Sequence, residues 1–227
     1  MVTVERQSPP LAALLSFNGG YVDTAGFLAL HGLFTAHVTG NFVTLGASLV
    51  NGTSGAIAKL LALPVFCLII FITRLVAYWL KAREFPVLRT MLFLKLTLLL
   101  LATGLALSFG PFPDGDSTWA IATGMSLVAA MAIQNAAHRV HLAQLPPTTL
   151  MTGTTTQMML DCADLFHGLP QTDKDLALAR LSNMGRAVSV FALGCGSAAL
   201  FYGVAREWCF VLPPLLAALM LLIKTAS

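Results

Sequence analysis

The sequence predicts an all-α, polytopic membrane protein that forms one membrane domain over residues 1–227. Hydrophobic residues make up 57% of the chain and charged residues only 10%, whereas soluble domains carry about 25% charged residues. The mean hydropathy is +0.80. The apolar residues also form runs close to the length of about 20 residues with which a helix crosses roughly 30 Å of hydrocarbon. These observations exclude an ordinary soluble domain.

The apolar runs predict six transmembrane helices, at residues 11–33, 60–80, 91–109, 119–137, 187–202 and 208–223. Two further segments, 39–50 and 152–166, are apolar but short. A helix over the 12 residues of the first segment is about 18 Å long, so it reaches only about the bilayer midplane. We therefore expect two broken or re-entrant helices. The alternative is that both segments cross fully and give eight spans.

The distribution of charge favours the re-entrant layout. Basic residues collect in short cytoplasmic loops, and the clearest basic loop is residues 81–89. The opposite side is marked by Asp114 and Asp116, in a loop without basic residues. If both short segments re-enter, most Lys and Arg residues fall inside and only Lys59 and Arg206 remain outside. Full crossing would move most of the others outside. The charges thus predict cytoplasmic N and C termini.

The re-entrant layout also predicts two inverted repeats, about residues 11–110 and about residues 118–224. Each repeat contains one span, one short segment and two further spans, and the two repeats enter the membrane from opposite sides. Inverted repeats with interrupted helices are a recurring plan of membrane transporters. An offset of 113 residues aligns Thr35 with Thr148, Thr39 with Thr152 and Gly40 with Gly153.

The Thr-Gly step at the start of each short segment predicts a polar site near the membrane midplane. A threonine hydroxyl can cap the following helix, glycine allows a tight turn or a close approach, and a helix N-terminus attracts anions. The alternative is that these small residues only allow close helix crossings. The candidate solute-binding residues are Tyr21, Asp23, Thr39, Gly40, Asn41, Gln134, Asn135, Thr152, Gly153 and Thr154.

Asp23 is the leading candidate for an ionisable group within the membrane, where a carboxylate is costly and by default functional. We expect it to bind a proton or to coordinate the solute. The alternative is a structural hydrogen bond or ion pair that fixes a break at Gly19-Gly20. Asp161 and His37 are the other candidates for proton coupling.

The remaining polar residues in the apolar runs predict no further chemistry. Arg74 and Lys95 lie about two turns from the basic loop 81–89, so we expect their side chains to extend toward it. The four cysteines have no metal-ligand spacing. We therefore expect neither a metal site nor a cofactor.

Four segments of the sequence resemble a known family. These are GGYVDTAGFLAL, FTAHVTGNFVTLG, AIQNA and TTLMTGTTTQ, which together are similar to the YoaK family of bacterial integral membrane proteins. The resemblance implies a multi-pass protein of the bacterial inner membrane. The family is known chiefly as inner-membrane proteins of unassigned function, so it implies no substrate and no catalytic residues for this chain.

The predicted function is that of a secondary transporter or channel for a small polar or anionic solute, with proton coupling through Asp23 as a further hypothesis. The alternatives are a membrane-embedded enzyme that acts on a lipid or quinone, and a structural membrane protein. We find no nucleophile motif and expect no enzyme activity. The predicted partners are the lipid bilayer and the solute, without nucleic acid. The small residues 194–197 favour a homodimer through close helix contact.

Overall fold

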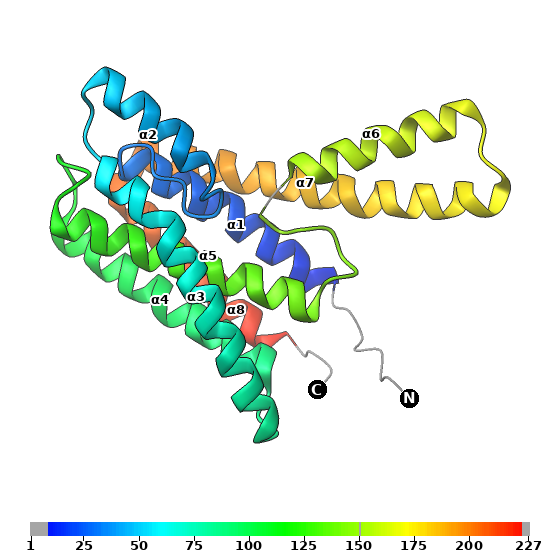
Figure 1. Cartoon of the computed structure of the whole chain (residues 1–227), viewed down its shortest axis with the longest axis horizontal. Helices are drawn as coiled ribbons and strands as arrows, with labels where there is room; N and C mark the ends of the chain where they lie inside the picture. Colours follow the sequence, from blue (N-terminus) through cyan, green and yellow to red (C-terminus); the bar gives the residue numbers. More distant parts are fainter. Residues whose placement is uncertain (1–8, 150, 224–227) are drawn as a thin grey trace.

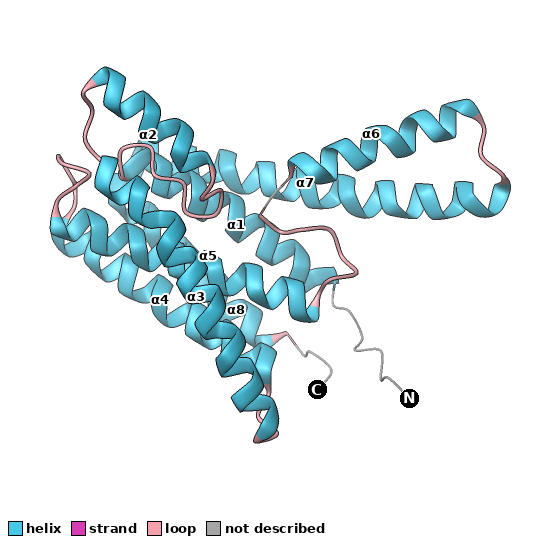
Figure 2. Ribbon diagram, in the orientation of Figure 1, coloured by secondary structure: helices cyan, strands magenta, loops and turns pink. Residues whose placement is uncertain are grey.

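The computed structural model describes residues 9–149 and 151–223, and every regular element in these ranges is a helix (Figure 1 and Figure 2). The elements are α1 (Pro9–Ala29), α2 (Gly40–Asn51), α3 (Ala56–Ala82), α4 (Val87–Phe109), α5 (Thr118–His141), α6 (Thr152–His167), α7 (Gln171–Ala205), the 3-10 helix η1 (Arg206–Val211) and α8 (Leu212–Leu222). The all-α class is confirmed. Both chain ends, with Arg6 and Lys224, lie outside the described residues.

Within the described residues, four segments are long and apolar enough to cross a membrane: α3, α4, α5, and the continuous stretch Gln171–Leu222 that contains α7, η1 and α8. The six predicted spans are thus found only in part. α1 has 21 residues but carries the polar residues Asn18 and Asp23. α8 has 11 residues, so it is about 16 Å long and too short to cross alone.

The outward faces of the long helices are apolar. α3 exposes Phe71 and Leu75, α4 exposes Phe93 and Leu100, and Val204 near the end of α7 is exposed as well. Contiguous apolar surface of this kind is unfavourable in water and matches a hydrocarbon environment. The architecture is therefore consistent with a membrane protein whose four apolar segments could cross the bilayer.

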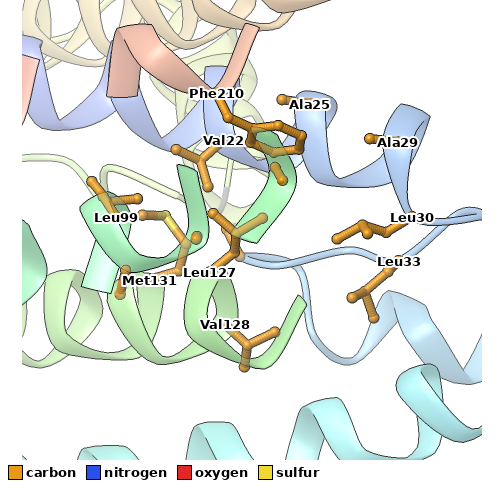
Figure 3. Close-up of a cluster of buried hydrophobic side chains, with 14 of the residues drawn as sticks. Val22, Ala25, Ala29, Leu30, Leu33, Leu99, Leu127, Val128, Met131 and Phe210 are labelled. Atoms are coloured by element: carbon orange, nitrogen blue, oxygen red, sulfur yellow. The ribbon is translucent and has the colours of Figure 1, made fainter. Parts of the chain in front are cut away.

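α5 lies at the centre of the bundle and is buried along most of its length. Leu127 and Met131 of α5 pack with Val22 of α1, Leu99 of α4 and Phe210 of η1 in one apolar cluster (Figure 3). Elements from both ends of the sequence thus meet at α5. This central cluster fixes the relative positions of the helices that carry the polar residues described below.

The crossing of α1 and α7 depends on glycine, and it is the closest such helix contact in the described chain. A Cβ atom at Gly20 would lie 2.2 Å from the carbonyl oxygen of Phe191, and one at Gly194 would lie 2.2 Å from that of Phe17. Only glycine allows the two backbones to approach so closely. Gly194, considered above for a dimer contact, therefore packs within the protomer, whereas Gly196 is exposed with nothing near it.

The two halves of the chain have the same order of α-helices and share several helix contacts, although the 3-10 helix η1 occurs only in the second half of the described chain. α1 packs on α7 and, equivalently, α5 packs on α3. α2 packs on α3 and α6 on α7, while α4 contacts α5 and α8 contacts α1. Residues 30–39 connect α1 to α2 and residues 142–151 connect α5 to α6, so both loops contain ten residues.

The loop that follows α2 and the acidic loop that follows α4 lie at the same end of the molecule. Asp116 accepts hydrogen bonds of 2.9–3.1 Å from the backbone N–H groups of residues 55–58, the start of α3. Its carboxylate thereby neutralises the positive end of that helix. α6 and the first part of α7 form a hairpin that projects from the bundle on the side away from this end (Figure 1).

Candidate functional site

One face of α1 receives the loops that precede both short helices. Gly19, Asp23 and Gly26 follow the i, i+4, i+7 spacing and share this face. A Cβ atom at Gly19 would lie 2.7 Å from the carbonyl oxygen of Thr148, and one at Gly26 would lie 2.7 Å from the side chain of Thr35. The two contacts are two turns apart, about 10 Å along the helix axis.

The loop before α2 is held by Asp23. The Asp23 Oδ1 atom accepts hydrogen bonds from the backbone N–H groups of Thr35 and Ala36, both at 2.7 Å, and a longer one of 3.3 Å from the Thr35 hydroxyl. The Nδ1 atom of His37 lies 2.5 Å from the Asp23 Oδ2 atom. Asp23 is almost fully buried. Its two oxygens therefore fix a reversal of the chain at this depth.

The chain between α1 and α3 leaves and returns at the same end of the molecule. His31, just after α1, lies 3.2 Å from the Ser54 hydroxyl, which follows α2. Between these two points the loop runs back along α1 to Asp23 before α2 leads outward again. Asn41 closes the loop with hydrogen bonds of 2.8 Å to both the N–H and the carbonyl of Phe34. The chain thus forms a loop and a short helix that begin and end at the same end of the molecule.

The loop before α6 is held by two amides of α5. Gln134 donates through Nε2 to the carbonyl of Leu15 at 2.9 Å and to the Thr148 hydroxyl at 3.1 Å. Asn135 accepts a hydrogen bond of 2.8 Å from the Thr149 hydroxyl. The anchoring residues precede the helix end by about two turns in both halves, since Asp23 is six residues before Ala29 and Asn135 six before His141.

Lys95 of α4 belongs to the same network and was not among the predicted site residues. It is completely buried, and its Nζ atom donates to Gln134 Oε1 at 2.6 Å. The prediction that Lys95 extends to the basic loop is wrong, because its face of α4 packs on α5. Arg74, in contrast, is exposed and lies over the Tyr78 ring, 4.4 Å from its centroid.

The threonines of the Thr-Gly steps do not cap the short helices, and the role of these steps in solute binding stays a prediction. Thr39 is exposed, and its hydroxyl makes no cap hydrogen bond because its backbone is helical (φ −71°, ψ −25°) rather than extended. Thr152 is the first residue of α6 and also exposed. A Cβ atom at Gly153 would touch nothing within 4 Å, whereas one at Gly40 would lie 3.1 Å from the Phe34 ring.

Thr154 differs from Thr39 and Thr152, because it is buried and its hydroxyl has no hydrogen-bond partner in the described chain. Tyr21 is also buried, but its hydroxyl donates to the carbonyl of Cys209 at 2.9 Å, so it joins α1 to η1. Among the predicted site residues, Tyr21 and Asn41 thus have fully structural contacts. Asp23, Gln134 and Asn135 lie where the loops meet α1.

Asp161 lies on the projecting hairpin and does not join Asp23 and His37. It is buried against Arg180 of α7, which donates to its two oxygens at 2.8 and 3.1 Å, while Gln157 donates at 2.9 Å. α6 lies outside the four candidate spans, and there the hydrogen bond from Arg180 lowers the pKa of the Asp161 carboxyl. This pair ties α6 to α7.

A cavity of about 40 Å³ lies on the same face of α1, one turn before Gly19. It is lined by Ser16 of α1, by Leu145 and Pro146 of the loop before α6, and by Asn183 and Arg186 of α7, together with Ala12, Ala13 and Ala187. This volume is enough for about three water molecules. Within the described residues, no three His, Cys, Asp or Glu side chains are grouped to hold a metal ion.

Comparison with known protein families gives one match, which covers residues 11–223. The matching family model is described as "Protein of unknown function (DUF1275)". The chain belongs to this family. No curated protein and no solved structure matches the chain significantly. The YoaK name and the bacterial origin stay predictions, and the function has to be argued from the geometry.

Proposed function

We propose that this protein is a secondary transporter or channel that passes a small polar or anionic solute along the face of α1 where the two loops meet. One observation carries the proposal: the loops before α2 and α6 both reach this face, next to Asp23 and Gly19. Non-helical backbone at membrane depth is tolerated where it is buried in protein or lines a water-filled cavity. Here the loops are buried, next to polar side chains and a small cavity.

The repeated packing of the helices supports this proposal. We infer that residues 11–110 and 118–224 are inverted repeats, because exchanging the halves exchanges the α1–α7 contact with the α5–α3 contact. α2 and α6 both begin near the middle of the molecule and run outward on different sides of it, α2 toward the upper left and α6 toward the right (Figure 1). In transporters built from inverted repeats, discontinuous helices form the solute site at the interface between the repeats.

The proposed setting is the bacterial inner membrane, with both termini in the cytoplasm and no enzymatic activity. Cysteine accessibility tests this topology. The native residues Cys67, Cys162, Cys195 and Cys209 are replaced, and single cysteines are placed in residues 52–55 and 168–170. We expect an impermeant maleimide to label the first loop only from outside and the second only from inside. Labelling of both from one side would contradict the inversion.

A flux assay in proteoliposomes tests the transport function. Swelling rates are recorded with glycerol, urea, chloride, nitrate and phosphate as the gradient solutes. Thr35→Val and Thr148→Val each remove a hydroxyl where the loops meet α1. Each variant would lose one hydrogen bond between the hydroxyl and the passing solute, and such a bond contributes about 0.5–1.5 kcal/mol. We therefore expect the flux to fall about three- to tenfold in each variant.

The matched control is Thr97→Val, the same change at an exposed position of α4. The Thr97 hydroxyl bonds only to the carbonyl of Leu94 in its own helix, so its loss should change the flux less than twofold. If vesicles with the protein are as impermeable as empty vesicles to all five solutes, the transport function is wrong. Equal effects of the three variants would remove the loops from the pathway.

A further inference from the structure

Lys95 is a buried basic residue whose side chain bonds to an amide rather than to a carboxylate. Its side chain has no exposed surface, and its Nζ atom has one partner in the described chain, Gln134 Oε1 at 2.6 Å. A protonated lysine carries three N–H donors, so in that state two of them would have no protein acceptor. A charge at this depth is expensive unless it is paired, and it marks a site of function by default.

None of the elements packed against α4 supplies the missing negative charge. α8 contains no titratable residue, and no titratable group of α3, α5 or η1 makes an ion pair or hydrogen bond with Lys95 in the described chain. On α5, the nearest titratable residue along the helix is His138, one turn beyond Gln134. The carboxylate of Asp23 already accepts hydrogen bonds from backbone N–H groups of the loop before α2 and contacts the His37 ring.

The network connects Lys95 to the cavity on α1. Gln134 bonds at once to Lys95, to the carbonyl of Leu15 and to the Thr148 hydroxyl. The next residue after Leu15, Ser16, lines the cavity, as does Arg186, which is exposed and basic. Neither Gln134 nor Lys95 lines the cavity, so a small anion that enters at Arg186 has to pass the loop before α6 to reach the lysine.

We propose that Lys95 is an anion-binding residue that takes up one proton together with one small inorganic anion. The inference rests on the proposed transport function and names its solute class. In the empty state the side chain is a neutral amine that donates to Gln134. Binding adds a proton from the aqueous side to the Nζ atom and places the anion against the resulting ammonium group. The pair has no net charge, and release on the other side returns both ions.

The charge balance follows from the site itself. An ammonium group alone would carry a buried positive charge, and an anion alone would carry a buried negative one. The bound anion takes the place of the missing carboxylate beside the protonated lysine. Proton and anion therefore stabilise each other's binding. We infer that the anion reaches Lys95 by way of the cavity of about 40 Å³, which has room for only a few heavy atoms. Small ions such as chloride, nitrate and phosphate are the matching class.

Proton uptake by the purified full chain in detergent tests the binding step without any need for transport. Sodium chloride, nitrate, sulfate or phosphate is added to weakly buffered protein near pH 7, and the pH of the medium is recorded. We expect at least one anion to cause the uptake of about one proton per chain. Lys95→Gln, which keeps a neutral donor for Gln134, and Lys95→Arg, which holds its proton, should each lose this uptake.

Proteoliposomes with an internal pH dye test the coupled movement. An inward gradient of the active anion should acidify the lumen in wild-type vesicles. Lys95→Gln should lose at least tenfold in both anion flux and acidification. Lys95→Arg should lose the acidification but keep exchange of labelled anion for unlabelled anion, because its charge is permanent. The control Lys81→Gln changes an exposed lysine and should stay within twofold of wild type.

The outcomes separate this inference from the transport function. Retention of anion-linked proton uptake in Lys95→Gln would overturn the role of Lys95, and so would equal acidification in wild type and Lys95→Arg. If none of the anions causes proton uptake while glycerol or urea still crosses, the anion site is wrong and the transport function survives. If no solute crosses and no proton is taken up, both are wrong.

Discussion

The loops before α2 and α6 have the same length and both meet one face of α1, but they are held by different chemistry. The loop before α2 is bound through backbone N–H groups to the carboxylate of Asp23. The loop before α6 is bound through the hydroxyls of Thr148 and Thr149 to the amides of Gln134 and Asn135. Charge-assisted hydrogen bonds are about twice as strong as bonds between neutral groups.

This difference indicates which half of the molecule is fixed and which can change. In the first half, an anion accepts bonds from the backbone itself, and Asn41 adds two more. In the second half, the loop position depends on an amide that is also bound by Lys95. A change in the charge of Lys95 would therefore reach Thr148 through one side chain. We infer that the first loop is the static wall of the site and the second is its mobile part.

The largest effect is expected from Asp23→Ala, which removes the anchor of the static loop. Two buried backbone N–H groups, of Thr35 and Ala36, would lose their acceptor, and each unsatisfied donor costs about 1–3 kcal/mol. We expect the free energy of unfolding in detergent to fall by about 3 kcal/mol or more. Thermal unfolding followed by circular dichroism measures the change.

Asp114→Ala is the matched control for this variant. Asp114 is exposed and accepts one hydrogen bond, from the N–H group of Asp116, so its loss should cost less than about 0.5 kcal/mol. Equal losses in the two variants would show that the loop before α2 does not depend on Asp23. The comparison between the two loops would then have no energetic basis.

A smaller loss is expected from Gln134→Leu, which breaks the anchor of the second loop. The change removes the bonds of Gln134 to the Nζ atom of Lys95, the carbonyl of Leu15 and the hydroxyl of Thr148. Because a bond between neutral groups contributes about 0.5–1.5 kcal/mol, whereas bonds to the charged Asp23 contribute about 1.5–3 kcal/mol, we expect a loss of about 2 kcal/mol. Adding Lys95→Met removes the buried donor as well. The double variant should therefore lose less stability than the sum of the two single variants.

Strict additivity in this cycle would mean that Lys95 and Gln134 do not interact, against the 2.6 Å contact. A loss larger than that of Asp23→Ala would reverse the order proposed for the two loops. The cycle thus measures directly how strongly the lysine controls the second anchor. Unfolding in detergent, monitored as for Asp23, supplies all three values.

The all-α fold class and the positions of the two short helices could be predicted from the sequence, because hydropathy and helix length are local properties. The boundaries of the predicted segment 39–50 differ from those of α2 by one residue at each end. Asp23 could be singled out because a carboxylate in an apolar run is conspicuous. In the structure Asp23 fixes the loop before α2 through hydrogen bonds and its contact with His37, rather than a break at Gly19-Gly20. Its role in binding a proton or the solute stays a prediction.

Contacts between distant residues could not be derived in the same way. Lys95 was assigned to the interface because it is two turns from a basic loop, yet the rotation of α4 turns it toward Gln134, 39 residues later. No local pattern reports that rotation. The segment 208–223 was predicted as one span, but it includes most of η1, and Pro213 and Pro214 follow at the start of α8. Proline restricts the residue before it, which favours such an interruption.

The smallest effect concerns the repeated Thr-Gly steps, which are alike in sequence and unlike in structure. Gly153→Ala adds a methyl group that meets no atom within 4 Å, and alanine is favoured over glycine in a helix, so a gain of up to about 0.5–1 kcal/mol is expected. At Gly40 the new Cβ atom would lie 3.1 Å from the Phe34 ring. The ring must shift, but Asn41 holds the backbone of Phe34 through hydrogen bonds to its N–H and carbonyl groups. Gly40→Ala should therefore be neutral or destabilising by about 0.5 kcal/mol. Unfolding midpoints that move in the same direction by the same amount would show that the two loops are packed alike after all.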